Sequence, residues 1–375
     1  MKRKTLSYDK VVTIENLMDV YKTVRNNTRH KEKIFVFELF FSCNIISIYN
    51  ILKSEEYKHG KYNIFIIKEP KYRLIMSECM TDKIINHLIS TYFLFPLIDS
   101  LLLPMNVATR PLMGSDKGIY YIKKYINKLK YKHDKIYVLK CDIAKYFYSI
   151  DQEILLEKLK NLIDDEKVFN LVKEVIISTN YDYVNECINK SIDKEIKRLK
   201  TLPINDYQEH VNSLKSIPLY KKGKGLPIGN MTSQILAVYY LNDLDHYIKE
   251  KLGIKCYVRY MDDFILFHED REYLKYCLGE IEKKLAEVKL KLNKKTQILE
   301  IHHGFCFLGY RFILEDKKLL MLLSSDTKKR VIKRVKYVRK NKPEMLDKTL
   351  ASYNGYLNRA ASGSFRFKHD LKVKK

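Results

Sequence analysis

The chain has 375 residues, of which 70 are Lys or Arg and 45 are Asp or Glu, so its formal net charge is +25. This length exceeds the needs of one small core and indicates two or three subdomains. An AT-rich coding sequence inflates Lys, Asn, Ile and Tyr, but the acidic residues do not keep pace, which is typical of a protein that binds nucleic acid. The seven cysteines are scattered without a CxxC pair, which argues against a zinc or disulfide framework and favours a cytoplasmic location.

The first third of the chain predicts helices followed by a pair of strands. The pattern is helical from Ile14 to about Lys53. Within it, the apolar stretch Ile34–Tyr49 is too short and too polar for a membrane span, so we expect a buried helix and no membrane partner. The segment "YNIFIIKEPKYRLIM" (62–76) predicts two short strands joined at Pro70. A helix with a buried face follows from Asp82 to about Leu103.

Strands and helices then alternate. The segment "KIYVLKCDIAKYF" (135–147) begins as a strand because β-branched and aromatic residues lead up to Asp142. The remaining expected elements are helices over 152–200, a loop over 223–234, a helix over 231–251, a hairpin over 256–268, a helix over 272–293, a strand over 305–314 and a basic helical tail from Thr327. This interleaving predicts an α+β fold with helices packed on one face of a sheet.

Three aspartates stand at the ends of predicted strands. Asp142 closes one strand, and Asp262 and Asp263 lie inside "YVRYMDDFILF" (257–267). Neighbouring strands would bring these carboxylates together, where like charges raise each other's pKa and destabilise the fold. A divalent cation removes this repulsion, and carboxylates completed by water and phosphate form a typical Mg²⁺ site. Two such ions, Mg²⁺ or substituting Mn²⁺, bind the attacking and leaving oxygens of a phosphoryl transfer.

An aspartate pair in a hairpin is more often an ordinary solvated turn. Here the flanking "YVRY" and "FILF" predict buried hairpin arms, and a strand that bears an acid lies upstream in the chain. We therefore predict that Asp142, Asp262 and Asp263 are catalytic, with Asp142 and Asp262 holding metal and Asp263 supporting them.

Five motifs in this order resemble those of reverse transcriptases. They are "LKCDIAKYF" (139–147), "KGLPIGNMTSQ" (224–234), "YVRYMDDFILF", "LKLNKKTQ" (290–297) and "FCFLGY" (305–310). The likeness extends from about Glu15 to Tyr310 and implies a right-hand polymerase of α+β class. It places the fingers at 1–134, the palm at 135–154 and 223–314, a helical insertion at 155–222 and a basic helical thumb at 315–375. It also places Ile143 beside the metal.

The resemblance implies a set of residues that bind the incoming nucleotide. Arg73, with Lys68 or Lys71, would bind the triphosphate, as would Lys294 or Lys295. Phe147 stands where the family has its ribose gate, and its ring would exclude a 2′-hydroxyl. Plain core packing is the alternative for this side chain. Gly229 would let the backbone approach a nucleotide closely. Ile228 replaces a polar residue that buttresses the new base pair, so fidelity is expected to fall.

Template and primer contacts are implied more loosely. The stretch "NVATRPLMGSDKGIYYIKKYI" (106–126) retains Arg110, Gly114 and Lys117 of a more basic family motif, whereas Pro111–Met113 depart from it. The basic segment "TKKRVIKRVKYVRKNK" (327–342) suits a thumb helix that follows a phosphate backbone, and a solvated helix is the alternative. The expected template and primer residues are Arg110, Lys117, Ser233, Gln234, Tyr260, Met261, Gly309, Lys333 and Arg334.

The motif details resemble one branch of the family most. "LPIGN", where "LPQG" is commoner, and Met261 before the aspartates are similar to reverse transcriptases of diversity-generating retroelements, and related enzymes of antiphage defence carry similar cores. The expected partners are a structured noncoding RNA template, dNTPs and a DNA, RNA or protein primer, with an accessory protein or a second copy as further candidates. A catalytically idle RNA chaperone and an RNA-templated RNA polymerase are the alternative functions.

Overall fold

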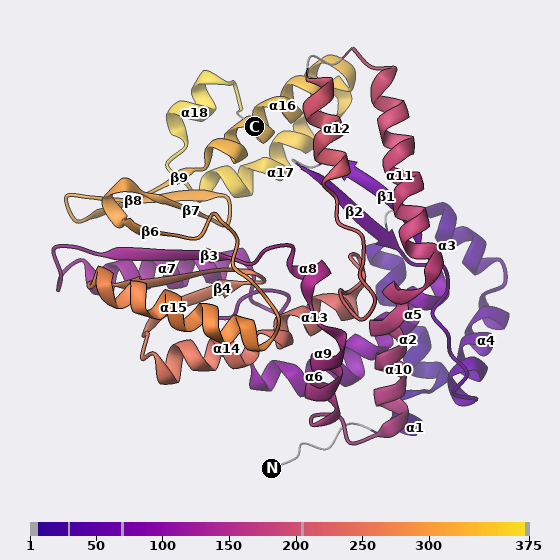
Figure 1. The fold of residues 1–375 in the computed structure, drawn as a ribbon. Helices are drawn as coiled ribbons and strands as arrows, with labels where there is room; N and C mark the ends of the chain where they lie inside the picture. Colours follow the sequence, from indigo (N-terminus) through magenta and orange to yellow (C-terminus); the bar gives the residue numbers. More distant parts are fainter. Residues whose placement is uncertain (1–6, 29–30, 69–70, 204–205, 372–375) are drawn as a thin grey trace. The chain divides into compact units, whose positions relative to one another are not determined.

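The computed structural model describes residues 7–28, 31–68, 71–203 and 206–371, so Pro70 lies outside the described residues. The chain forms two compact units, each assembled from three stretches of sequence (Figure 1). Unit 1 comprises Met1–Pro104, Ile143–His246 and Lys283–Lys291, and unit 2 comprises Met105–Asp142, Tyr247–Glu282 and Leu292–Lys375. Helices and antiparallel strands alternate along the chain, which confirms the predicted α+β class. The finer division into fingers, palm and thumb stays a prediction.

Unit 1 is mainly helical. Its N-terminal helices are α1 (Tyr8–Val11), α2 (Ile14–Asn27), α3 (Lys31–Glu38), α4 (Phe41–Lys53), α5 (Met80–Leu88) and α6 (Phe95–Ile98), with a π-helical turn at Ile89–Leu94. Its second stretch holds α8 (Tyr146–Ser149), α9 (Gln152–Lys160), α10 (Glu166–Ile177), α11 (Asp182–Lys200), α12 (Tyr207–Lys215), α13 (Met231–Tyr240) and α14 (Asn242–His246). The strands β1 (Asn63–Lys68) and β2 (Tyr72–Ser77) pair antiparallel, as predicted, and pack with α11 around a buried apolar cluster.

The stretch Ile34–Tyr49 is not the single buried helix that we expected. It breaks after α3, and α4 leaves at 85°. Asn44 Nδ2 of α4 donates to Phe37 O of α3 across the break (2.9 Å), and Glu38, the last residue of α3, accepts from Arg25 Nε of α2 (2.6 Å). As a result, the large side chains at the break lie mostly exposed: Phe35, Val36, Leu39 and Phe40. Elsewhere, Met80–Leu101 is apolar and long enough to cross a membrane, and 56% of its apolar window is buried inside the protein.

Unit 2 is built on a four-stranded antiparallel sheet of order β4-β5-β3-β6. The strands are β3 (Tyr137–Asp142), β4 (Cys256–Tyr260), β5 (Asp263–His268) and β6 (Gln297–Glu300). The predicted hairpin is confirmed, with Tyr260 and Asp263 as the last pair before the turn. Helix α15 (Arg271–Glu287) follows β5, and its last turn belongs to unit 1.

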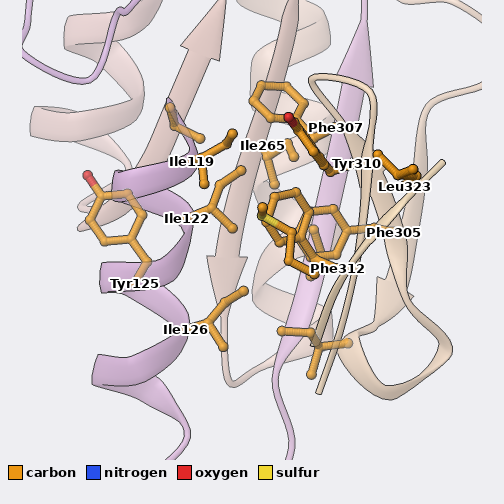
Figure 2. Close-up of a cluster of buried hydrophobic side chains, with 14 of the residues drawn as sticks. Ile119, Ile122, Tyr125, Ile126, Ile265, Phe305, Phe307, Tyr310, Phe312 and Leu323 are labelled. Carbon is orange, nitrogen blue, oxygen red and sulfur yellow. The ribbon is translucent and has the colours of Figure 1, made fainter. Parts of the chain in front are cut away.

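One face of this sheet carries a buried apolar cluster of unit 2. Helix α7 (Ser115–Leu129) contributes Ile119, Ile122 and Ile126, and β5 contributes Ile265 (Figure 2). The second sheet of the unit, of order β7-β8-β9, adds the stacked rings of Phe305 and Phe312. Side chains alternate along a strand, so Val138 in this cluster shares its face with Lys140 and Asp142. The apolar core therefore packs against the part of this face near Val138, and Lys140 and Asp142 lie on the same face toward the end of β3.

In the C-terminal part of unit 2, the strand predicted over 305–314 and the helices predicted from Thr327 are present, and the strand at Lys318–Leu323 is the departure from the all-helical segment expected at 315–375. Strands β7 (Phe305–Phe307), β8 (Tyr310–Glu315) and β9 (Lys318–Leu323) precede helices α16 (Ser325–Asn341), α17 (Leu346–Asn358) and α18 (Gly363–Lys368). Gly309 links the strands to the helices, because Ser324 N and Thr327 Oγ1 both donate to its carbonyl. Its φ is +82°, and an added Cβ would lie 1.8 Å from Tyr356 Oη, so the position requires glycine.

Candidate active site

The strand register places two of the three aspartates opposite each other. Asp142 ends β3, Asp263 begins β5, and the two residues are antiparallel partners. Asp262 stands next to them in the two-residue turn between β4 and β5. The pairing that the sequence suggested only in outline therefore has a definite form: Asp142 and Asp263 share one edge of the sheet, and Asp262 lies in the turn.

The turn has a strained residue and a buried cation that holds it. Met261 has a φ of +58°, which an unbranched L residue seldom adopts and which is common at functional turns. The Arg259 side chain is completely buried, and its Nη1 donates to the Met261 carbonyl (2.8 Å). The backbone of Arg259 is fixed as well, since its N–H donates to Met105 O (3.1 Å) and its carbonyl accepts from Val107 N (3.0 Å). Arg259 is thus a positioning residue for the aspartate turn.

A pocket of about 440 Å³ opens at the carboxylate edge, lined by Lys140, Asp142, Asp263, Lys295 and Gln297. Lys140 Nζ lies 3.8 Å from Asp263 Oδ2 and donates to the Cys306 carbonyl (2.8 Å), which ties the two sheets of unit 2 together at this point. Both signs of charge therefore face the same space. Such a space suits a ligand that carries a cation and an anion together, as a metal–triphosphate does.

Asp142 is held from two directions by Asn293. The Asn293 side chain donates through Nδ2 to Asp142 Oδ2 (2.9 Å), and its backbone N–H donates to Asp142 O (2.7 Å). The Asn293 carbonyl oxygen Oδ1 accepts from Lys295 N (3.2 Å). One residue thus fixes the rotamer of the carboxylate and the turn that carries Lys295 into the pocket.

The electrostatics of Asp263 fit a divalent cation. Burial, opposed by Lys140 and helped by the charges of Asp142 and Asp262, raises its pKa to about 7. Its Oδ1 is buried and has no hydrogen-bond partner among the described residues. An unsatisfied carboxylate oxygen beside a second carboxylate is unfavourable unless a proton or a metal ion occupies it. Asp142 and Asp263 are therefore the residues that would hold a metal ion.

The rest of a metal shell would come from outside the protein. Within the described ranges, no group of three or more His, Cys, Asp or Glu side chains is arranged to hold a metal ion. Mg²⁺ commonly takes one or two carboxylates and completes its octahedron with water and substrate phosphate. The two opposed carboxylates fit this pattern, and Asp262, which the sequence also predicts as a ligand, stands next to them in the turn, where its metal role stays a prediction.

The raised pKa of Asp263 predicts a metal-dependent response to pH. Its ordinary value is 3.8, so the metal-free fold gains a proton relative to the unfolded chain between pH 4 and 7. Stability should therefore fall as the pH rises through this window and level off above pH 7. Mg²⁺ needs the ionised carboxylate, so it should raise the melting temperature more at pH 8 than at pH 5.5.

Thermal unfolding with and without Mg²⁺ across this range tests the prediction. Asp263→Asn should lose the metal-dependent difference, while the pH dependence due to Glu78, whose pKa burial raises to about 8, should remain. A wild-type protein that Mg²⁺ stabilises equally at both pH values would contradict the prediction.

The other residues of unit 2 that were predicted to bind nucleotide, template or primer are spread over several elements. Of the two lysine alternatives, Lys295 lines the pocket and Lys294 does not. Tyr260 pairs with Asp263 at the end of β4, and Arg110 donates to Asn106 O (3.2 Å). Lys117 lies in the first turn of α7. It stays a prediction that these residues contact template or primer. The same holds for Gly309, for Met261 and for the exposed Lys333 and Arg334 of α16.

Unit 1 joins two of the predicted nucleotide-binding motifs. Leu226 N donates to the Phe147 carbonyl (2.8 Å), and Gly225 N donates to Ile150 O (2.7 Å). The half-buried Phe147 and the loop before α13 therefore form one backbone-linked structure. The role of the Phe147 ring as a ribose gate stays a prediction.

The loop residues have structural roles that the sequence did not reveal. An added Cβ at Gly229, whose φ is +137°, would lie 2.6 Å from Met76 O, and Ile228 O accepts from Met76 N (2.8 Å). Glycine is thus required here for packing against β2, whatever its relation to a nucleotide. Ser233 is only 1% exposed, which does not fit its expected contact with template, whereas Gln234 is exposed.

The predicted triphosphate residues of the β1–β2 hairpin are exposed. Arg73 lies on β2, and Lys71 precedes that strand. Lys68, at the end of β1, interacts with the His210 ring and lies 5.2 Å from the Tyr72 ring centroid. Ile143 is buried, directly after Asp142 in the chain.

A comparison with known protein families identifies the family of this chain. Residues 58–312 match the family model described as reverse transcriptase (RNA-dependent DNA polymerase), which is more than half of the chain. The chain belongs to the reverse transcriptase family. The family description names RNA-dependent DNA polymerases, and members of this family use an RNA template, nucleotide substrates and a divalent metal ion.

Solved structures also resemble this reverse transcriptase, with 365 matching chains. One is telomerase from Candida albicans in complex with a TWJ fragment of telomeric RNA, which is 14% identical, with a TM-score of 0.42. That match covers 84% of this chain and 57% of the telomerase chain, so the reverse transcriptase spans little more than half of that protein. A comparison with curated proteins finds no match.

Proposed function

We propose that this reverse transcriptase extends a primer on a structured noncoding RNA, with two Mg²⁺ ions at the carboxylate edge of unit 2. The observation that carries the proposal is the opposed pair Asp142 and Asp263, which line a pocket together with Lys295, and the buried, unsatisfied Oδ1 of Asp263. An idle RNA-binding descendant of the family would have no need of this unfavourable pair. The net charge of +25 supports an extended nucleic-acid partner.

In the proposed reaction, the primer 3′-oxygen forms a bond to the α-phosphorus of a dNTP. The bond between the α-phosphorus and the bridging oxygen breaks, pyrophosphate leaves, and the 3′-hydroxyl proton passes to solvent. Bound Mg²⁺ would supply Lewis-acid stabilisation of the attacking and leaving oxygens. Asp142, fixed by Asn293, and Asp263, fixed by β5, would hold the ions, and Lys295 would offset charge on the triphosphate.

Primer extension on RNA tests the function directly. The protein should add dNTPs to a DNA or RNA primer annealed to RNA in Mg²⁺, or label itself if a protein side chain primes. Synthesis from NTPs on the same template would instead indicate an RNA polymerase. Tight RNA binding with no product under any primer would favour the idle chaperone.

Phe147 is expected to exclude ribonucleotides. Phe147→Ala should raise incorporation of NTPs relative to dNTPs by roughly tenfold or more, because the ring that would meet a 2′-hydroxyl is gone. The ratio of kcat/KM for dATP and ATP measures this. Phe365→Ala, which removes a half-buried ring of α18 in unit 2, is the control and should leave the ratio unchanged. An unchanged ratio in Phe147→Ala would leave this ring as core packing alone.

Two alternative biological roles are proposed. Ile228 offers no side-chain hydrogen bond to a base pair, which supports error-prone copying in a diversity-generating retroelement. Antiphage defence is the other alternative, because enzymes of that class resemble the same motifs. The neighbouring genes distinguish them: a variable repeat with an accessory gene supports the retroelement, and defence genes beside a noncoding RNA support defence.

A further inference from the structure

Helix α7 of unit 2 has a second face that the polymerase site does not use. The segment from Ser115 through Lys135 contains seven lysines and two aspartates. The apolar residues of α7 pack against the sheet, and the opposite face carries lysines and tyrosines at helical spacing. This surface, called the α7 face below, comprises Lys117, Tyr120, Lys124, Lys128, Lys130 and Tyr131.

The aromatic rings of the α7 face are exposed and flanked by cations. Tyr120 is 51% exposed and Tyr131 is 73% exposed, which is unusual for large rings. Lys117 Nζ lies 4.8 Å from the Tyr120 ring centroid, and Lys124 Nζ lies 6.0 Å from it on the following turn. Lys130 Nζ lies 4.9 Å from the Tyr131 ring centroid. Each ring is thus a flat apolar surface bordered by positive charge.

More positive charge gathers at the C-terminal half of the helix. The pKa of Lys249 is lowered, mainly by burial. The nearby charges of Lys128 and Lys255 lower it further. Lys249 also donates to the Lys255 carbonyl (2.9 Å), which fixes its position. Crowded cations of this kind are stabilised when an anion binds.

The nearby acids do not neutralise this surface. Asp116, at the start of α7, pairs with Arg359 of α17 (2.8 Å). Glu269 lies 3.9 Å from His133, beyond the end of the helix. The residues of the α7 face include four lysines and no acid, so the face itself is positively charged, and none of its residues lines the catalytic pocket.

We propose that the α7 face binds a single-stranded segment of nucleic acid, separately from the catalytic pocket. Its lysines would contact phosphates, and Tyr120 and Tyr131 would each stack on a base. Alternating cations and exposed rings are the combination by which proteins hold single strands without reading their sequence. The binding requires no metal ion, primer or nucleotide, so it does not depend on the proposed polymerase chemistry.

A duplex or a lipid surface fits the α7 face less well. Stacking requires unpaired bases, which a duplex does not present at its surface. A membrane-bound helix buries a wide apolar face beneath its lysines, but the apolar side of α7 is already packed on the sheet. An unstructured part of the RNA is the natural occupant, and single-stranded DNA shares the same chemistry.

Fluorescence anisotropy with labelled 20-nucleotide oligo(U) and oligo(dT), in EDTA and without primer or dNTP, tests the proposal. An excess of unlabelled primer–template duplex would occupy the catalytic pocket. The variants are Lys124→Glu with Lys128→Glu, and Tyr120→Ala with Tyr131→Ala. The control, Lys194→Glu with Lys197→Glu, changes two exposed lysines of α11 in unit 1.

The proposal predicts different responses from the two variants. The lysine variant should bind at least tenfold more weakly, with the slope of log K against log salt reduced by about 1.4 for two lost phosphate contacts. The tyrosine variant should weaken binding by roughly tenfold at an unchanged slope, because stacking is not ionic. Both should extend a short primer–template at the wild-type rate, and the control should bind normally. The relative affinity for the two oligonucleotides identifies RNA or DNA.

Three results would overturn the proposal. One is wild-type affinity in both variants. Another is a parallel loss of primer extension on the short duplex, which would make the face part of the catalytic site. In the third, the variants bind the oligonucleotides as the wild type does but no longer bind vesicles of anionic lipid that the wild type binds. That result would make the partner a membrane. Failure of polymerisation alone, with the oligonucleotide results as expected, would leave this inference intact.

Discussion

The Asp142→Asn variant should lose primer extension by roughly a thousandfold, because several kcal/mol of charge stabilisation at the reacting phosphate disappears. Asparagine keeps the shape of the side chain and can still meet Asn293, so the fold should persist. It cannot supply the anionic oxygen opposite Asp263. Single-turnover extension with saturating dNTP isolates this step from binding.

Asp193→Asn is the matched control for Asp142→Asn, since it removes one exposed carboxylate from α11. Its extension rate should equal that of the wild type, and RNA binding by both variants should be normal. Retention of even a tenth of the activity in Asp142→Asn would show that this carboxylate does not take part in the chemistry.

Arg259→Met should lower kcat by roughly ten- to a hundredfold with little change in the KM for dNTP. The guanidinium is buried and donates to Met261 O, so its loss releases the strained turn that carries Asp262 and Asp263. A displacement of about 1 Å at reacting groups is enough for an effect of this size. Losing a hydrogen bond from a charged donor should also reduce the free energy of unfolding by about 2–3 kcal/mol.

Steady-state kinetics and hydrogen exchange at the β4–β5 turn test the role of Arg259. Arg311→Met is the control, because Arg311 also donates to a backbone carbonyl, that of His303, but away from the turn. Arg259→Lys should recover part of the activity, because a cation remains. Faster exchange at the turn with a wild-type kcat would show that Arg259 stabilises the fold without positioning the aspartates.

The sequence predicted the strands that carry the aspartates because they are local features. Runs of β-branched and aromatic residues lead into Asp142, and the two arms flanking Met261 and Asp262 form the expected hairpin. The opposition of Asp142 and Asp263, rather than Asp262, depends on the register between β3 and β5. Register is set by tertiary packing between segments more than a hundred residues apart, which local patterns do not encode.

The residues that support the site were missed for the same reason. Arg259 has only one local sign, a charge inside an otherwise apolar strand, and Asn293 has none, because its partner lies 151 residues away. The burial of Ser233 and the contact of Gly229 with Met76 also arise from distant segments. Ile34–Tyr49 misled because its apolar composition predicts burial, while the break after α3, which Asn44 bridges, leaves four large side chains exposed.

The most direct measurement is anomalous diffraction from crystals soaked with Mn²⁺ and a non-hydrolysable dNTP analogue. We expect a peak bound by oxygens of both Asp142 and Asp263, at about 2.0–2.3 Å from each, with the triphosphate beside it. A metal peak that neither carboxylate contacts, or a bound triphosphate whose metal ignores Asp142 and Asp263, would contradict the account.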